Sequence, residues 1–447
     1  MRLGARVDPR SLSWAVLVGL ACAGAGVLSG INPALGLAVT LGLAFAVAVI
    51  ANLTLGVAMF TILSFLEVIN TGGAALSFMK AAGLLLFVSW FAIAATRAGH
   101  TPSLLTQQPV LVAGAVALVA WSAMSVAWAQ SSGAAVTGTE RYLLNILLLP
   151  IVFAAIRRRE DVMWIVGAFV LGAAASAVYG LVESAGGRLT GSFGDPNEQA
   201  AVLVVAIMLA IGLGGSLRPG SPARFFVFAS AAICTFGLVN TVSRGGLIAL
   251  GCALLAGVIF GGRWRGRALL LMIVGVLAVG GYFGFVAPLA ARQHFSSGNS
   301  TGRTDLWKVG WKMFGANPIG GVGSNNFQVA AVRYVQQAGS LTRADLIVDV
   351  PHVTHNQYLD VLDELGLPGL AALLVVLGSA IAAAAVAAKR YEQAGDARFE
   401  LLSRMLVLGL VGILASDVFL SGQYSKQLWL LIALAGPLLA LAPAKTR

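Results

Sequence analysis

Charged residues are what this sequence lacks most. Of its 447 residues, 11% are Asp, Glu, Lys or Arg and 58% are hydrophobic, whereas a soluble protein carries about 25% charged residues. The composition therefore excludes a soluble globular protein. We predict an all-α polytopic membrane protein, because a helix satisfies its own backbone hydrogen bonds inside a bilayer.

Cysteine and histidine are also scarce. Cys22, Cys234 and Cys252 all lie within apolar segments, so they provide neither a disulfide framework nor a metal cluster. His352 and His355 are three residues apart but lack a convincing third ligand, and the sequence contains no Asp-x-Asp motif. We therefore expect neither a metal site nor a cofactor.

Apolar segments dominate what remains. A transmembrane helix needs roughly 17–25 such residues. We count about fourteen segments that reach or nearly reach this length, and therefore expect 12–14 transmembrane helices. The segments are 12–30, 34–50, 53–69, 79–96, 109–128, 142–156, 162–184, 199–217, 225–242, 245–261, 268–289, 365–388, 401–420 and 425–442.

One long polar interruption divides the chain into three regions. Transmembrane helices 1–11 fall in residues 1–289, a polar loop occupies 290–358, and the last transmembrane helices fall in 359–447. In a chain that is otherwise almost all membrane, we expect the chemistry to lie at the base of this loop. The loop carries Arg292, Arg303, Arg333, Arg343, His352 and His355.

Lysine and arginine outside this loop predict the orientation. With the N-terminus inside, the basic clusters, such as Arg157-Arg158-Arg159, fall in loops on the inner side, as the positive-inside rule expects. Basic inner loops also account for most of the net charge of +11 without nucleic acid. Both termini are then cytoplasmic, and the long loop is external.

Two short helices are predicted inside the long loop, where they would lie on the outer membrane surface and roof a cavity. The apolar face of the first helix consists of Trp307, Gly310, Trp311 and Phe314. Ser324 is predicted to cap the second helix, whose apolar face consists of Phe327, Ala331 and Tyr334.

His355 is the candidate base. Thr354 and Gln357 match a capping box, which would place His355 in the first turn of the helix that follows the loop. A histidine in this position can accept a proton near neutral pH. A hydrogen-bonded interface histidine fits the residues equally well.

Three external arginines are candidates for binding an anion. Arg244 follows Ser243 at the outer end of a hairpin, where it either binds an anion or snorkels to the interface. Arg303 opposes the dipole at a helix N-terminus unless an anion offsets it, with Asp305 as an alternative partner. Arg188 precedes a turn that could merely cap the next helix. Guanidinium groups bind phosphate bidentately and stay charged, so they suit a diphosphate whose tail lies in the bilayer.

Several motifs follow one another in a fixed order. They are SRGG at 243–246, GRTDLW at 302–307, NPIGGVGSNNF at 317–327 and HNQYL at 355–359, preceded by GSFGDPN at 191–197. This ordered set resembles the O-antigen ligase/polymerase family of bacterial envelope glycosyltransferases. The N-terminal half is similar to that family only in being hydrophobic.

The resemblance implies a metal-independent transferase with a helical, GT-C-like bundle in the bacterial inner membrane. Such an enzyme moves a glycan from undecaprenyl diphosphate to an acceptor hydroxyl on the periplasmic side. By position, Arg244 and Arg303, with Arg188 as a less secure third residue, would bind the diphosphate. His355 would be the catalytic histidine, supported by Asn356, Ser243 and His352. The acceptor, whether lipid A core, a growing polysaccharide or a protein, stays open.

A polyprenyl-linked glycan flippase or another multi-helix transporter is the alternative. Glu67, Glu183 and Asp417 lie within or near apolar segments, and intramembrane acids often mark ion pathways. However, the sequence has no inverted repeat and no matching pair of broken helices, which are typical of such transporters.

Overall fold

The computed structural model describes residues 23–24, 26–27, 29–65, 78–96, 103–183, 187–296 and 302–444. These residues form helices, turns and loops, with no strand among them. Within this part of the chain, eight helices are long and apolar enough to cross a membrane, and five shorter apolar helices accompany them. The prediction of an all-α polytopic membrane protein is therefore confirmed.

The apolar helices follow the chain in a simple order. They are α2 (Pro33–Ala51), α3 (Leu53–Leu63), α4 (Phe78–Thr96), α6 (Pro109–Ser125), α7 (Ser132–Ile146), α8 (Leu148–Ala155), α9 (Arg159–Glu183), α10 (Pro196–Ser216), α11 (Pro222–Asn240), α12 (Arg244–Phe260), α13 (Arg265–Gly281), α18 (Gln357–Gln393), α19 (Ala397–Ser416) and α20 (Lys426–Ala440). Short helices in the connections are α5 (Leu104–Gln107), α14 (Leu289–Ser296), α15 (Arg303–Ala316), α16 (Phe327–Ala330) and α17 (Asp345–Val348).

Most predicted spans coincide with these helices, but several ends differ. The span predicted at 142–156 begins ten residues earlier, because α7 and α8 form one apolar stretch, Ser132–Ala155. The segment predicted at 53–69 leaves the helix after Leu63. Most of the predicted first span, and Glu67, lie outside the described residues.

The centre of the bundle is α10, which packs along α19. Side chains from Gln199 to Ala210 are buried all round the helix, as expected for a helix enclosed by others. Gly212 lets the two helices approach closely, since a Cβ there would lie 3.0 Å from the Cβ of Met405. This α10–α19 pair supports residues of the candidate site at its ends.

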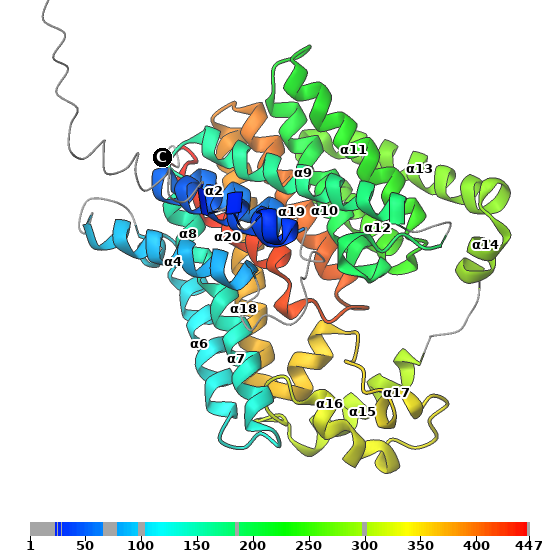
Figure 1. Ribbon diagram of the computed structural model, residues 1–447. Helices are drawn as coiled ribbons and strands as arrows, with labels where there is room; N and C mark the ends of the chain where they lie inside the picture. The colour runs from blue at the N-terminus through cyan, green and yellow to red at the C-terminus, as the bar shows by residue number, and fades with distance from the viewer. Residues whose placement is uncertain are drawn as a thin grey trace, which may run out of the picture.

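Two parts of the molecule are visible in Figure 1. The bundle that includes α9 to α13 and α19 occupies the upper part, and the loop helices α15, α16 and α17 lie together below it. Helices α6, α7 and α18 run between the two parts. The loop is therefore held against the bundle rather than extended away from it.

Helix α18 is broken near its start, and residues of the loop form hydrogen bonds with the backbone groups at the break. Gly366 has φ 65° and ψ −166°, a conformation open essentially to glycine alone. The carbonyl oxygens of Asp363 and Glu364 accept hydrogen bonds from the backbone N–H groups of Val322 and Gly323, each at 2.9 Å. The backbone groups that the break exposes thus find partners in the loop, as a membrane-embedded helix requires.

The loop segment after α15 is also fixed by side chains. The buried Glu364 carboxylate accepts hydrogen bonds from the backbone N–H groups of Asn325, at 2.7 Å, and Phe327, at 3.1 Å. Asn326 accepts a hydrogen bond from the N–H of Ser131, in the α6–α7 turn, at 2.8 Å. Two regions distant in the sequence, the start of α18 and the α6–α7 turn, therefore hold this loop segment in place.

The loop helices have their own small core, and here two predictions were wrong. The buried face of α15 consists of Leu306, Val309, Gly310 and Met313, whereas Trp311 is 57% exposed. Ser324 caps no helix, because it is buried in the preceding turn and its N–H donates to Ser125. Phe327, Ala331 and Tyr334 do share one face, packed against the α15 core.

Candidate functional site

Arg303 is the first residue of α15, as the sequence predicted. Gly302 precedes it with φ 81°, a left-handed conformation that glycine adopts without strain. The possible local partner, Asp305, is engaged elsewhere: its carboxylate accepts the backbone N–H groups of Thr342, at 2.7 Å, and Arg343, at 2.8 Å. Lys308 also pairs with Asp305, at 3.1 Å. Arg303 forms no ion pair within the described part of the chain.

Arg244 is the first residue of α12. Ser243 caps this helix, with its hydroxyl oxygen accepting the N–H of Gly246 at 3.1 Å. The same hydroxyl donates to the side-chain oxygen of Asn197 at 2.8 Å. The predicted supporting role of Ser243 therefore has a structural basis, since it ties Arg244 to the start of α10.

Arg188 reaches the same turn from the loop between α9 and α10. Its Nε donates to the carbonyl oxygen of Thr241 at 2.9 Å, and its guanidinium donates to Asn197 at 3.4 Å. Asn197 thus receives hydrogen bonds from both Arg188 and Ser243. Asp195 caps α10, as the sequence allowed, by accepting the N–H groups of Asn197 and Glu198.

These three arginines lie close enough to affect one another. Desolvation lowers the pKa of Arg188; nearby Asp195 opposes this effect, and the charges of Arg303 and Arg244 add to it. Desolvation likewise lowers the pKa of Arg303, with Asp195 opposing and Arg244 adding. Guanidinium groups remain charged at neutral pH despite such shifts. The site therefore concentrates positive charge that a single nearby carboxylate offsets.

His355 lies just before α18, not inside its first turn. The predicted capping box is wrong: Asn356 is the cap, and its side chain accepts the N–H groups of Tyr358 and Leu359, each at 3.1 Å. Thr354 instead receives a hydrogen bond from the N–H of Asn356 at 3.2 Å. His355 has φ 51°, uncommon for a residue with a side chain.

Contacts on both sides hold His355 in this conformation. The indole N–H of Trp307, in α15, donates to the carbonyl oxygen of Thr354 at 2.9 Å. The N–H of Gln357 donates to the carbonyl oxygens of Asp417, at 2.9 Å, and Leu420, at 2.7 Å. A strained residue fixed by its neighbours is often found at a functional site.

The environment keeps His355 neutral. Desolvation lowers the pKa of its imidazole, and the charge of Arg303 lowers it further, while Asp195 acts in the opposite direction and His352 adds a small decrease. A neutral imidazole at neutral pH can accept a proton. The same interactions place His355 near Arg303 and Asp195, so the predicted catalytic residue and the predicted anion-binding residues share one site.

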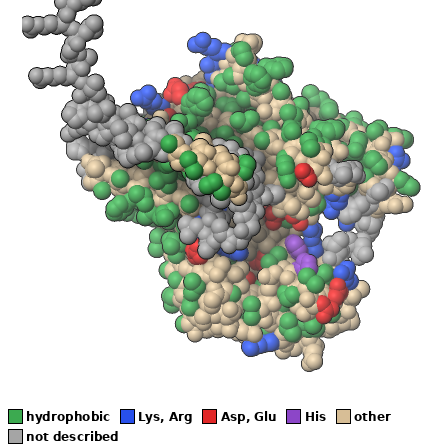
Figure 2. All heavy atoms as spheres, viewed as in Figure 1, with side chains coloured by type: hydrophobic (Ala, Val, Ile, Leu, Met, Phe, Trp, Pro, Cys, Tyr) green, Lys and Arg blue, Asp and Glu red, His purple; other side chains and the backbone are tan. Residues whose placement is uncertain are grey.

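His352 lies beside His355, with 6.3 Å between the ring centroids. Its Nδ1 contacts the carbonyl oxygen of Val350, and its backbone N–H donates to Leu346 at 3.0 Å. Figure 2 shows histidine side chains next to basic ones where the bundle meets the loop helices. His352 is thus an immediate neighbour of the candidate base.

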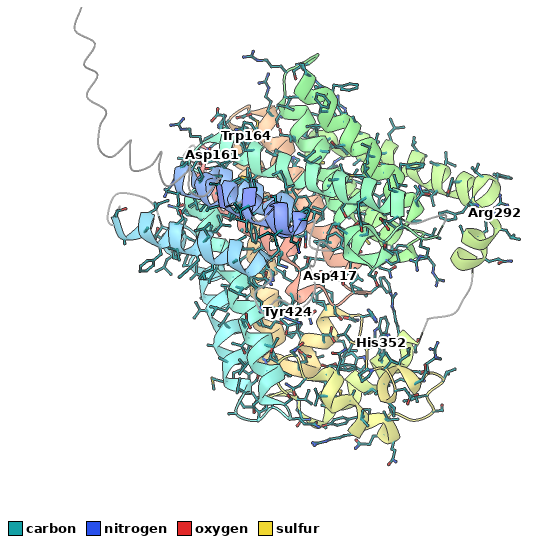
Figure 3. The ribbon with its side chains drawn as sticks, viewed as in Figure 1. Asp161, Trp164, Arg292, His352, Asp417 and Tyr424 are labelled. Carbon is teal, nitrogen blue, oxygen red and sulfur yellow. The ribbon has the colours of Figure 1, made fainter. Side chains whose placement is uncertain are left out.

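His355 also lines a cavity of about 360 Å³. Its acidic lining consists of Glu198, Asp360, Glu364 and Asp417, and its basic lining of Arg141 and Lys426. Figure 3 shows Asp417 and Tyr424, both of which line it, between the bundle and the loop part that carries His352. His355 therefore lines a mixed, largely acidic cavity and also interacts with Arg303.

Sequence reasoning missed several residues that assemble this site. Asn197 was noted only as part of a turn, although it joins Arg188 to Ser243. Phe419 follows α19; its ring stacks on Trp307 at 6.5 Å between centroids, and Gly245 lies against it. Phe419 thus connects the starts of α12 and α15. Only the tertiary fold reveals these contacts, because the residues are far apart in the sequence.

Part of the chain matches a known protein family. Residues 226–374 match the family model described as O-antigen ligase. The match includes Arg244, Arg303 and His355 but not Arg188. No curated protein matches the chain. The resemblance drawn from the ordered motifs is therefore confirmed for residues 226–374, which form about a third of the chain.

Proposed function

We propose that this protein transfers a glycan from undecaprenyl diphosphate to an acceptor hydroxyl on the periplasmic face of the bacterial inner membrane. The observation that carries the proposal is the convergence of Arg188, Arg244 and Arg303 beside a neutral His355. The family match supports transfer of a lipid-linked glycan. The prenyl tail would lie against the membrane-spanning helices.

The arginines would hold the diphosphate and stabilise the charge that grows on it as it leaves. The bond between the anomeric carbon and the diphosphate oxygen breaks, and the diphosphate departs with the electron pair. Fixed donors that meet developing charge are often the largest single contribution to catalysis. Because guanidinium groups can provide this charge, we propose that transfer needs no metal.

His355 would accept the proton of the acceptor hydroxyl as its oxygen bonds to the anomeric carbon. The lowered pKa of His355 favours this role, since the imidazole is unprotonated and ready at neutral pH. The carboxylates of the neighbouring cavity, Asp360 and Asp417 among them, are suited to hold acceptor hydroxyls. The acceptor would then reach His355 through this cavity.

The distribution of basic residues supports the orientation. Arg188, Arg244 and Arg303 lie near the start of α10, the start of α12 and the loop helices, whereas Arg218 and Arg263 follow the far ends of α10 and α12. The positive-inside rule assigns the second group, which lies in short loops, to the cytoplasm. The site would then be periplasmic and both termini cytoplasmic.

The test is transfer by purified protein in detergent, with an undecaprenyl diphosphate-linked glycan and an acceptor glycan. A flippase could not produce this signal, because a micelle has no second compartment. We expect Arg303→Ala to lower the rate by about 10²–10³, as loss of a transition-state donor does. Arg303→Lys should recover part of the rate, because it restores the charge without the bidentate fork.

Arg333→Ala is the matched control, since Arg333 is an exposed arginine of the same loop. It should transfer as fast as wild type. Full activity in Arg303→Ala would refute the diphosphate role. A folded wild-type protein that moves donor across vesicles but never transfers it would favour the flippase.

A further inference from the structure

A second cavity, of about 670 Å³, lies at the opposite ends of the same helices. It is lined from the end of α10, the start of α11, the end of α12 and the start of α13, together with the second half of α18 and α19. The arginine cluster lies at the start of α12, about 25 Å away for a helix of this length. The two cavities are therefore separate sites.

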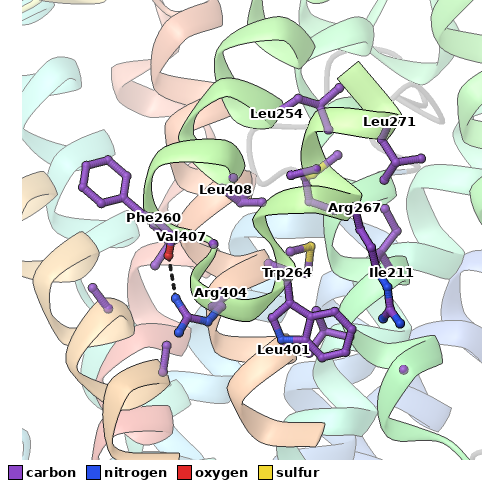
Figure 4. A pocket seen from close by; sticks show the side chains of 18 of the residues that line it. Ile211, Leu254, Phe260, Trp264, Arg267, Leu271, Leu401, Arg404, Val407 and Leu408 are labelled. Atoms are coloured by element: carbon purple, nitrogen blue, oxygen red, sulfur yellow. Dashed lines mark hydrogen bonds between the residues drawn. The ribbon is translucent and has the colours of Figure 1, made fainter. Parts of the chain in front are cut away.

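The lining of this cavity is mainly apolar. Figure 4 shows Leu254, Leu271 and Leu408 around it. Helices α12 and α13 approach closely at Gly257 and Ala268, but α13 buries none of its residues. Leu271, for example, is 47% exposed. The groove beside α13 is thus accessible from the side. Its volume lies within the range of about 300–1,000 Å³ that is typical of ligand sites.

Positive charge gathers at the rim of this groove. Five cations line it, Arg224, Arg267, Lys389, Arg398 and Arg404, against one carboxylate, Glu392. Arg404 is engaged, with Glu392 and the buried Glu400, each at 2.9 Å. None of the other four forms an ion pair in the described part of the chain. The rim therefore has an excess of positive charge.

Trp264 provides an independent indication of a ligand. Its indole lies in the lining of the groove, with the guanidinium of Arg267 over the ring at 4.7 Å. The buried Nε1–H has no hydrogen-bond partner. A buried donor without an acceptor is costly. An acceptor oxygen of a ligand in the groove would satisfy it.

We propose that this groove binds an anionic phospholipid of the surrounding membrane. An acyl chain lies along Leu254, Leu271 and Leu408, and the phosphate lies among Arg267, Arg224, Lys389 and Arg398. Trp264 donates its N–H to a phosphate or ester oxygen. Charge complementarity selects an anionic lipid, because the zwitterionic headgroup of phosphatidylcholine would leave the cations uncompensated. Basic pockets between helices on the cytoplasmic side are known to bind anionic headgroups.

The experiment titrates delipidated, purified protein with phosphatidylglycerol and follows the bound lipid by native mass spectrometry. Phosphatidylglycerol should bind more tightly than phosphatidylcholine. The double variant Arg267→Ala/Arg398→Ala should weaken phosphatidylglycerol binding by roughly fivefold for each cation removed. Arg218→Ala, at the same end but outside the groove lining, is the matched control and should leave binding unchanged. Inorganic phosphate should not compete, since it lacks the acyl chain.

A second variant tests the groove without altering charge. Leu271→Trp should fill the apolar part, which its exposure permits, and weaken phosphatidylglycerol binding. Equal binding of the two phospholipids, or a double variant that matches Arg218→Ala, would overturn the proposal. Preferential binding of undecaprenyl diphosphate in the groove would also overturn it. None of these outcomes depends on the transfer assay, so this site and the transferase site can fail separately.

Discussion

Arginines lie near both ends of α12, but two pairs of them differ in whether they form ion pairs among the described residues. At one end, Arg263 and Arg404 share the buried carboxylate of Glu400. At the other end, the charges of Arg303 and Arg244 lower the pKa of Arg188, and neither Arg188 nor Arg303 forms an ion pair among the described residues. The contrast indicates that Arg263 and Arg404 stabilise the fold, whereas Arg188 and Arg303 fit the proposed role of binding an external anion.

The largest expected effect is on the transfer rate when His355, the candidate base beside Arg303, is replaced. His355→Ala should lower the transfer rate by about 10²–10⁴, the usual contribution of a general base. Its thermal unfolding should match wild type, because the side chain is only half-buried. A transfer assay and a melting curve on the same preparation check both parts. Undiminished transfer in this variant would remove His355 from the mechanism.

Glu400→Gln tests the ion-paired arginines at the other end of α12, and it should lower stability rather than activity. Removing one partner of a buried ion pair destabilises a protein by about 3 kcal/mol. Arg404, whose side chain is 13% exposed, would lose one of its two carboxylate partners, the one at 2.9 Å in Glu400. The melting temperature should fall while transfer per folded molecule stays the same. A Glu400→Gln protein that is as stable as wild type but inactive would contradict the distinction between the two groups of arginines.

Asn356→Ala should have a smaller effect, at the helix cap that positions His355. Loss of a cap costs about 1 kcal/mol, and the two hydrogen bonds to Tyr358 and Leu359 would be lost. Because His355 is then less well fixed, kcat should fall more than KM rises. Asn356→Asp keeps an accepting oxygen and should restore activity. Equal activity of the Ala and Asp variants would show that the cap does not position the histidine.

The smallest expected effect is a shift in the pH profile. The pKa of His355 is lowered by desolvation and by Arg303, so the acid limb of kcat/KM should lie below the ordinary histidine value of about 6.5. Asp195 raises this pKa; Asp195→Asn should therefore move the acid limb to lower pH. Asparagine still caps α10. A limb that moves upward in this variant would contradict the assigned electrostatics.

Local sequence patterns predicted the parts of the site that lie at helix starts. Ser243 and Gly302 are turn and cap residues, so the placement of Arg244 and Arg303 at helix N-termini follows from their immediate neighbours. The cap at His355 was misassigned, because Thr354 and Asn356 are both good cap residues and local pattern does not choose between them. Contacts with α15 and α19 decide it.

The sequence patterns did not predict the long-range contacts. The span predicted at 365–388 lies within α18, but the hydrogen bonds from Val322 and Gly323 to its broken backbone join residues some forty apart. Asn197 and Phe419 belong to the site only because α10 and α19 pack side by side. Hydrophobic pattern fixes which segments are helices, and it carries little information about which helix ends meet.

The central claim is that Arg188, Arg244 and Arg303 together bind a lipid-linked diphosphate. The most direct measurement is equilibrium binding of undecaprenyl diphosphate-linked glycan to purified protein with His355→Ala as the background, which prevents turnover. Adding Arg303→Ala should weaken binding at least tenfold, while adding Arg333→Ala should leave it unchanged. Identical affinities in the Arg303 and Arg333 variants would contradict the account.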